Sequence, residues 1–364
     1  MVLRAASPPR RAIVRELAAA RRLCAAATLA ATSCAHAAWP DQNALRPAGI
    51  QAVRIASLWH WTLLVCALVF AAVLAALALA LWRRAPAGAA APMEDDRPLP
   101  PDPRRERRAS RVTRTATAAS VVVLAGLIVA DVLTDRALSR LPVTDALRIE
   151  MTGHQWWWDV RYPADGAGGD GGFATANELH VPVGRAVIVS LKAADVIHTF
   201  WAPNLHGKKD MIPGRDATIA FRVDKPGRYR GQCAEYCGLE HALMAFVVVA
   251  EPQAQFDAWV AQQRRPAVDA PSSFPQAGQR VFVAGACATC HTVRGTPASG
   301  TLGPDLTHVM SRSMLAGGTF PNDRAHLARW LRTPGALKPG TTMPPSTLSP
   351  MEQQAVIAWL ETLR

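Results

Sequence analysis

The sequence predicts a multidomain membrane protein, with a two-helix transmembrane hairpin, an all-β sandwich domain and a C-terminal all-α domain. Three patterns lead to this fold class. Two long apolar stretches lie within the first 135 residues. Short runs of alternating apolar residues, separated by Gly and Pro, follow from about residue 147. The last ninety residues have helical periodicity instead, and a length of 364 residues suits two or three such domains.

Residues 1–37 have the composition of an export leader. The first 33 residues hold six Arg and one acid, and the short apolar stretch LCAAATLAATSCAHAA follows the Arg-rich start. The motif ATSC fits lipoprotein processing with a lipid on Cys34, whereas AHA before Ala38 fits ordinary cleavage. An uncleaved N-terminal extension is the third alternative, and the sequence leaves all three open.

A short N-terminal segment and a transmembrane hairpin occupy residues 38–139. The first span, about 57–82, contains no charged residue and is long enough to cross a bilayer. Tryptophans typical of interfacial anchors stand at its ends: Trp59, Trp61 and Trp82. The second span covers about 115–135 and carries Asp131 near its end. The loop between the spans contains RRERRASR, so the positive-inside rule places that loop in the cytoplasm and everything after residue 135 outside.

The net charge of +12 is unevenly distributed and does not indicate a nucleic-acid-binding protein. Residues 1–33 and 83–114 together carry nine of the twelve net positive charges. Both segments are explained by targeting and membrane topology, and the remainder of the chain is close to neutral. We therefore expect no basic groove for nucleic acid.

The external part divides into two predicted domains. Residues 140–261 contain the strand-like runs, such as ELHVPVGRAVIVSLKA and ALMAFVVVAE, and form the sandwich domain. Residues 262–274 are rich in Pro, Ser and charged residues and are assigned as a linker. Residues 275–364 form the helical domain, which ends in the amphipathic segment SPMEQQAVIAWLETL.

The motif CATCH in the helical domain predicts a covalently attached haem. Two thiols three residues apart, Cys287 and Cys290, can add to the two haem vinyl groups, and the adjacent His291 then faces the iron. A chance match and a redox dithiol are the alternatives. For the sixth ligand we favour Met343, which stands in the proline-flanked loop KPGTTMPP, over three other methionines: Met310, Met314 and Met351. The segment resembles a class I cytochrome c along its whole length, including GPDL, in which Pro304 would face His291.

The stretch GQCAEYCGLEHALMAF, residues 231–246, combines two thiols, an imidazole and a thioether. A disulfide, a zinc site and a copper site are all conceivable. Structural zinc sites use four Cys or His ligands, but only one His is local here, and the nearby thioether is a poor zinc ligand. Soft sulfur suits copper, and two Cys four apart can bridge two coppers. A sandwich that binds copper in this way resembles a cupredoxin.

Three segments are similar to the signature segments of subunit II of haem–copper cytochrome c oxidases: GHQWWWDVRY, DVIHTFWAPNLHGKKDMIPGR and GQCAEYCGLEHALM. The resemblance covers about residues 40–260, and the fused haem domain resembles the caa-type subclass. It implies a binuclear copper A centre with six ligands: His198, Cys233, the carbonyl of Glu235, Cys237, His241 and Met244. It also implies that the Glu235 carboxylate reaches a magnesium or manganese ion at the boundary with subunit I.

The same resemblance makes Trp156 the residue of electron entry. Relatives that bind a soluble cytochrome c carry acidic residues after the tryptophans, whereas this chain offers only Asp159, Asp165 and Asp170 among glycines. Electrostatic attraction of a basic partner would then be weak. A tethered donor needs no such attraction, so the fused haem is expected to replace diffusive docking as the main electron input.

The resulting expectation is an electron-entry subunit of a terminal oxidase in the bacterial plasma membrane, with its copper and haem domains on the periplasmic side. Its implied partners are oxidase subunits I and III, and its implied donor is cytochrome c or the bc complex. Oxygen reduction in subunit I and proton translocation by the whole complex follow from the resemblance. Two alternatives stay open: an input subunit of a nitric oxide reductase and a membrane-anchored electron carrier.

Overall fold

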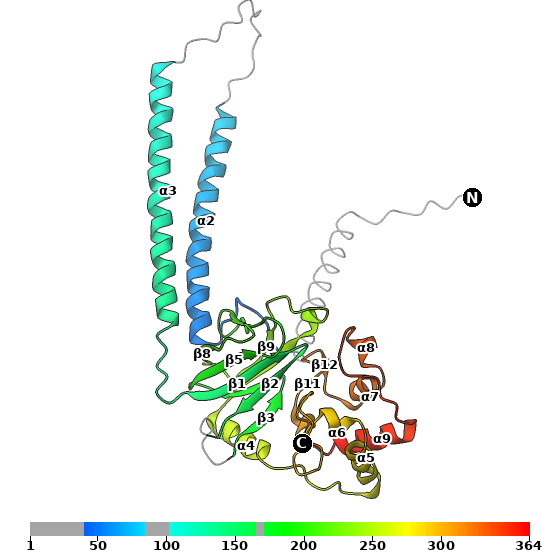
Figure 1. Ribbon diagram of the computed structural model, residues 1–364. Coiled ribbons are helices and arrows are strands. Elements are labelled where there is room, and N and C mark those ends of the chain that lie inside the picture. Colours follow the sequence, from blue (N-terminus) through cyan, green and yellow to red (C-terminus); the bar gives the residue numbers. More distant parts are fainter. Residues whose placement is uncertain (1–39, 84–101, 165–170) are drawn as a thin grey trace, which may run out of the picture.

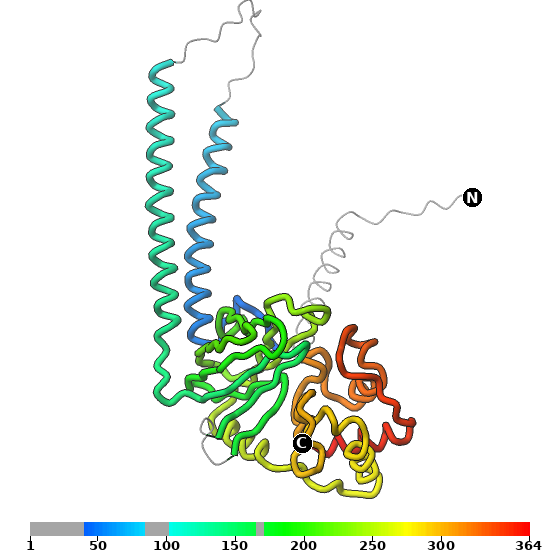
Figure 2. The backbone as a smooth tube through the Cα atoms, viewed as in Figure 1, coloured from blue at the N-terminus to red at the C-terminus, as the bar shows by residue number. Residues whose placement is uncertain are grey.

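The structure is a computed structural model that describes residues 40–83, 102–164 and 171–364. Two long helices stand beside each other and lead into a β-sandwich, and the C-terminal helical domain packs against one side of that sandwich (Figures 1 and 2). This arrangement confirms the predicted fold class. The leader and Cys34 lie outside the described residues.

Both helices of the hairpin are longer than the apolar spans predicted from the sequence. α2 covers Ile50–Trp82 and α3 covers Pro103–Leu138, and their apolar segments are exposed along the full length that could cross a membrane. The Arg-rich sequence RRERRASR lies in the first turns of α3, although we expected it in the loop. Asp102 explains this start, because its side chain accepts a hydrogen bond from the Arg104 amide at 2.9 Å and Pro103 occupies the first helical position.

The β domain consists of a five-stranded and a three-stranded sheet, in the orders β3-β2-β1-β5-β8 and β4-β10-β9. A short pair, β6-β7, lies beside them. The strands are β1 Leu147–His154, β2 Trp157–Tyr162, β3 Phe173–Ala176, β4 Glu178–Pro182, β5 Ala186–Ala193, β6 His198–Phe200, β7 Lys209–Met211, β8 Ala217–Arg222, β9 Gly227–Gln232 and β10 Ala245–Glu251. β1 alternates buried and more exposed residues, which places Leu147, Ile149 and Met151 in the core between the sheets.

The β domain ends in a helix and not at residue 261. α4 covers Gln253–Gln263, and the following helix begins at Ser273, so the irregular connection is shorter than the predicted linker. This connection packs against the C-terminal domain. The Ala267 amide donates to the Arg294 carbonyl at 2.8 Å, and a His308 ring nitrogen lies 2.9 Å from the Arg265 carbonyl.

The C-terminal domain is built around a close helix crossing. Its elements are α5 Ser273–Ala284, α6 Cys287–Cys290, η2 Val309–Ser311, β11 Met314–Leu315, β12 Phe320–Pro321, α7 Arg324–Arg332, α8 Pro334–Leu337 and α9 Pro350–Leu360. At the crossing of α5 and α9, a Cβ on Gly278 would lie 2.0 Å from the Ala355 carbonyl oxygen, so only glycine permits this approach. The short β11–β12 hairpin is an addition to the predicted all-α architecture.

Candidate metal and haem sites

The predicted copper ligands come from two regions of the β domain that are distant in sequence. His198 is the first residue of β6, and the other ligands lie between β9 and β10 in residues 233–244, which we call the copper loop. This loop contains a short 3₁₀ helix, His241–Leu243. Main-chain hydrogen bonds close it, because the Cys233 amide donates to the Met244 carbonyl at 2.9 Å.

All six predicted donor groups meet in this place. The Cys233 and Cys237 sulfurs are 3.7 Å apart. Cys233 Sγ lies 3.8 Å from His198 Nδ1 and 3.2 Å from the Glu235 carbonyl oxygen. Cys237 Sγ lies 3.7 Å from His241 Nδ1 and 3.8 Å from Met244 Sδ. Each sulfur therefore faces the other sulfur and two further donors, and this set of soft ligands fits a sulfur-bridged pair of coppers.

The two buried thiols oppose each other's ionisation because their sulfurs are 3.7 Å apart. The contact between the two sulfurs is the main cause that lowers the pKa of Cys233 to about 4. The same contact raises the pKa of Cys237 far above its usual range. One thiolate thus forms readily, while a second negative charge 3.7 Å away is opposed. A bound metal cation removes this opposition, because it compensates both thiolates at once.

A second layer of contacts orients the ligands. Asp195 Oδ1 lies 2.8 Å from His198 Nε2, which leaves Nδ1 pointing to the sulfurs. The same carboxylate accepts hydrogen bonds from the amides of Gln155 and Val196, each at 2.7 Å. Trp158, buried in the core, packs edge-on against the His198 ring.

The tryptophan assigned to electron entry is in direct contact with the copper loop. Trp156 Nε1 donates to the Cys237 carbonyl at 2.9 Å, and Gln155 Nε2 donates to the same oxygen at 2.8 Å. Gly238, at φ 112°, accommodates the indole, since a Cβ there would lie 3.0 Å from the Trp156 ring. The indole is therefore one hydrogen bond away from a predicted copper ligand.

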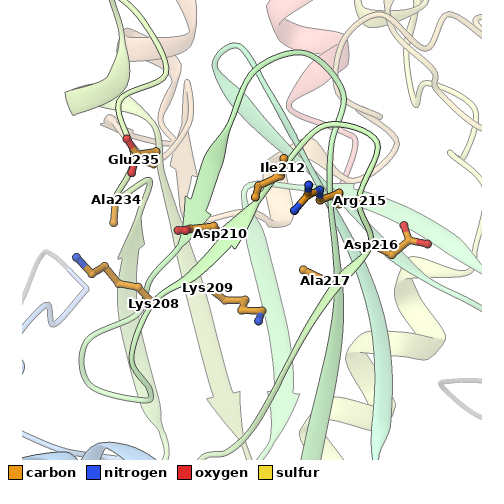
Figure 3. Close-up of a pocket in the computed structure, with 9 residues that line it drawn as sticks. All are labelled: Lys208, Lys209, Asp210, Ile212, Arg215, Asp216, Ala217, Ala234 and Glu235. Carbon is orange, nitrogen blue, oxygen red and sulfur yellow. The ribbon is translucent and has the colours of Figure 1, made fainter.

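The two functional groups of Glu235 face in different directions. Its carbonyl oxygen lies beside the Cys233 sulfur, and its side chain is exposed to solvent. The carboxylate lines an open pocket of about 610 Å³, shown in Figure 3. The rest of the lining is mostly charged: Lys208, Lys209, Asp210, Arg215 and Asp216. An open pocket with charged side chains of both signs thus lies beside the copper loop.

The haem attachment residues lie at the surface of the C-terminal domain. Cys287 and Cys290 are the ends of α6 and are free thiols of intermediate exposure. The His291 Nδ1 lies 2.8 Å from the Pro304 carbonyl oxygen, so Nε2 is the nitrogen that would be available to a haem iron. Gly303 leaves room for this ring, because a Cβ there would lie 2.6 Å from His291 Cε1. These residues fit a covalent haem with a histidine on its proximal side.

The four candidate methionines have different surroundings. Met314 is buried in β11 and Met310 packs against the core of the C-terminal domain. Met351 is 74% exposed on the first turn of α9. Met343 is half-buried in the loop between α8 and α9, and its role as the sixth ligand stays a prediction.

Sequence reasoning missed three residues next to these sites. Asp195 carried a signal, since it stands three residues before His198. Glu240 and Lys338 form a buried ion pair at 3.0 Å between the copper loop and the C-terminal domain. No local pattern connects them, because they are almost one hundred residues apart in the sequence.

Comparison with protein families identifies both external domains. The family described as cytochrome C oxidase subunit II, periplasmic domain, matches residues 168–251, and the family described as cytochrome c matches residues 275–364. The copper ligands and the CATCH motif fall within these two matches.

Individual relatives agree with the family matches. The chain is 37% identical over 217 residues to cytochrome c oxidase subunit 2 of Alkalihalophilus pseudofirmus, which covers 59% of this chain and 61% of the relative. It is 30% identical over 231 residues to the same subunit of Bacillus subtilis, over 60% of this chain and 63% of the relative. The chain thus spans less than two thirds of either relative. A crystal structure of the periplasmic domain of subunit II of cytochrome oxidase from Bradyrhizobium japonicum is 34% identical, with a TM-score of 0.31, and covers 34% of this chain and 96% of that chain.

Proposed function

The chain belongs to the cytochrome c oxidase subunit II family through its β domain and carries a cytochrome c domain at its C-terminal end, and from this premise we propose that it is the electron-entry subunit of a terminal haem–copper oxidase. It accepts electrons from cytochrome c or the bc complex with a covalent haem c and delivers them, with binuclear copper A, to subunit I. Oxygen is reduced to water in subunit I, coupled to proton translocation by the complex.

The observation that carries the proposal is the convergence of the six donor groups at the copper loop. In the proposed assignment Cys233 and Cys237 would be shared by the two metals. His198 and Met244 would hold one metal, and His241 and the Glu235 carbonyl would hold the other. When bound, copper A and haem c supply one-electron transfer. The strands on both sides hold the ligands at fixed positions, which keeps the rearrangement on electron transfer small.

In the C-terminal domain, Cys287 and Cys290 would hold the haem covalently, while His291 and Met343 would bind its iron. The Pro304 carbonyl keeps His291 in the tautomer with a free Nε2. A methionine opposite a histidine raises the reduction potential and suits electron transfer. Trp156 is the proposed point at which electrons enter the copper loop, and its hydrogen bond to Cys237 supports this role.

The side of the β domain that carries Glu235 is the proposed boundary with subunit I. The charged pocket beside Glu235 supports this orientation (Figure 3), and the carboxylate is the proposed ligand of a shared magnesium or manganese ion. Subunit III is a further proposed partner. The two apolar helices anchor the chain in a membrane, which we propose is the bacterial plasma membrane, with both external domains in the periplasm. Lipidation of Cys34 remains one of three alternatives for the leader.

The test is the optical and EPR spectrum of the full chain purified in mild detergent. We expect a low-spin c-type haem and a mixed-valence signal with hyperfine splitting shared over two copper nuclei. Cys237→Ser should abolish the shared signal, whereas Cys66→Ser, in the first membrane helix, should leave it unchanged. A spectrum of a single copper contradicts the binuclear assignment. Isolation as a monomer without oxidase subunits favours the membrane-anchored electron carrier.

A further inference from the structure

The C-terminal domain contacts the copper loop through a turn of the β11–β12 hairpin. This turn, residues 316–319, is called the glycine turn below. The Ala245 amide donates to the Gly317 carbonyl at 2.8 Å, and Thr319 Oγ1 donates to the Leu243 carbonyl at 3.1 Å. Arg230 Nη1 donates to the Gly318 carbonyl at 2.7 Å. Three hydrogen bonds thus join the main chain of the turn and its threonine to the end of the copper loop and the neighbouring strands.

Both glycines of the turn favour this contact through their backbone conformation and their small size. Gly317 and Gly318 have φ values of 66° and 70°, in the left-handed region. A Cβ on Gly317 would lie 3.2 Å from the Lys338 Nζ and from the Trp156 carbonyl oxygen, and one on Gly318 would lie 3.2 Å from Ala245 Cβ. The turn is therefore shaped to meet the β domain through its main chain.

Lys338 occupies the centre of the interface as a buried cation. Its side chain is 2% exposed, and Nζ lies 3.0 Å from Glu240 Oε2, whose side chain is also 2% exposed. The same ammonium donates to the Ala316 carbonyl at 3.1 Å and to the Trp156 carbonyl at 3.4 Å. It therefore joins the glycine turn, the electron-entry tryptophan and the copper loop in one set of contacts.

The position of this ion pair connects the two predicted redox sites. Glu240 stands between the copper ligands Cys237 and His241. Lys338 begins the loop that leads to Met343, and a Cβ on Gly340 in that loop would lie 3.0 Å from Leu239 of the copper loop. The loop that carries the predicted iron ligand thus packs on the loop that carries the copper ligands.

A second group of contacts holds the other side of the interface. Glu178 Oε2 accepts hydrogen bonds from Ser313 Oγ at 2.6 Å and from the Ser313 amide at 3.1 Å. Gln263 Nε2 donates to Ser311 Oγ at 3.2 Å. Because the connection after α4 also packs on the C-terminal domain, the domain is fixed at three places.

We propose that Lys338 is a positioning residue that holds the haem domain in one orientation on the copper loop. A buried ammonium that pairs with a buried carboxylate and two carbonyls has a strong angular requirement, since any rotation of the domain leaves both charges unpaired. The interface therefore replaces a freely moving tether by a fixed electron-transfer pair. The role of this contact in electron transfer rests on the proposed function, but the contact between the two domains is tested separately.

The first experiment measures hydrogen–deuterium exchange in the full chain as purified in detergent. The reporting amides are those of Ala245 and Ser313, which donate across the interface. Lys338→Met keeps the side-chain length but leaves Glu240 unpaired, so both amides should exchange about 10–100-fold faster. Lys192→Met, an exposed lysine on β5, is the matched control and should change neither amide.

Core amides distinguish positioning from general stability. Exchange in the core strand β1 should stay the same in Lys338→Met. Unchanged exchange at Ala245 and Ser313 overturns the proposal, and so does equally accelerated exchange in β1. Lys338→Met/Glu240→Gln removes both charges and should exchange more slowly than Lys338→Met alone at the two reporting amides.

A glycine variant tests the same interface should Lys338→Met fail to fold. Gly318→Ala adds a Cβ that meets Ala245, so the two reporting amides should again exchange faster. Gly184→Ala has a similar φ of 82° but meets open space, and it controls for backbone strain alone. Equal exchange at the two reporting amides in these two variants contradicts the proposal.

The second experiment measures the electron-transfer rate from haem to copper in the loaded full chain after flash reduction. In Lys338→Met we expect a rate at least about tenfold lower than the measured reduction potentials of the two centres account for, with the haem and copper spectra unchanged. An unchanged rate together with accelerated amide exchange means that positioning is not required for transfer, which also overturns the proposal. Absence of a dicopper or haem signal in the wild type counts against the proposed function and leaves the amide-exchange result decisive for the contact.

Discussion

At the residue scale, Asp195 joins separate segments of the β domain through one carboxylate. It holds the His198 ring and accepts the amides of Gln155 and Val196, so the predicted copper ligand and the chain before Trp156 share one anchor. The ligands themselves could be predicted because family motifs contain them in short spacings. The role of Asp195 could not, since the sequence does not say which way the imidazole points.

Asp195→Asn is expected to weaken copper binding about 10–100-fold, because the neutral amide no longer favours the tautomer that points Nδ1 to the sulfurs. The measurement is a copper titration of the full chain against a competing chelator. Asp257→Asn, on the exposed side of α4, is the control. Equal affinities of wild type and Asp195→Asn would exclude an orienting role.

His180 introduces a pH dependence at the base of the domain interface. Burial alone would lower its pKa, but hydrogen bonds to Glu178 and Glu251, at 3.0 and 2.8 Å, outweigh burial and raise the pKa above 6.5. The stabilisation by protonated His180 is therefore complete below pH 6.5 and is lost as the pH rises through the raised pKa. Burial would raise the pKa of Glu178, but the bond to His180 lowers it, so that contribution is lost only in acid.

We expect the melting temperature of the full chain to fall as the pH increases from 6.5 to 9, and His180→Gln to reduce this slope. Calorimetry at several pH values measures the melting temperature and therefore this slope. His326→Gln, a surface histidine paired with Asp323, should leave the slope as in the wild type. Parallel profiles of His180→Gln and wild type would contradict the assignment.

At the element scale, the presence of the helices could be predicted from composition, but the residues at which they begin depend on N-terminal capping. Asp102 extends α3 through an Arg-rich segment that hydropathy assigns to a loop. The capping box of Ser349 and Glu352 sets the start of α9, as the segment SPMEQQ suggests. The crossing of α5 and α9 could not be read from either helix alone, because it depends on how closely two distant segments approach.

Gly278→Ala should destabilise the C-terminal domain by at least about 1–3 kcal/mol, because the new methyl group would collide with the Ala355 carbonyl. Thermal unfolding followed by haem absorbance measures the loss. Gly335→Ala, in α8, places its methyl group in open space and should change stability little. A Gly278→Ala domain as stable as the control would mean that the helices separate at no cost.

At the scale of the whole molecule, the domain order was predictable and the domain interface was not. The sequence divides into hairpin, sandwich and helical domain by changes in periodicity. The Lys338–Glu240 pair, the glycine turn and the Glu178–Ser313 contact each join residues that lie far apart in the chain. Such pairings depend on how the surfaces of two folded domains fit together, and this fit cannot be predicted from the composition of either segment.

Deletion of residues 270–364 is expected to abolish most turnover with external cytochrome c, because few acidic residues remain on the β domain to attract a basic donor. Oxygen consumption by the assembled oxidase measures turnover, and an intact dicopper EPR signal confirms that the β domain is folded. Turnover equal to that of the full chain would show that diffusive docking suffices.

The segment before the first membrane helix has a mechanical consequence. Residues 40–49 pair with the sandwich, since the Asp41 amide bonds to the Arg228 carbonyl at 2.9 Å and the Ala48 amide to the Asn204 carbonyl at 2.8 Å. α2 therefore leaves the β domain at one point, and α3 enters it at another, through β1 (Figure 1). Because both helices hold it, the β domain cannot rotate freely about the membrane normal. The orientation of the copper loop about the membrane normal is thus fixed by both helices together, and inserting one residue into α2 alone would rotate its attachment by about 100° against that of α3 and strain the two connections.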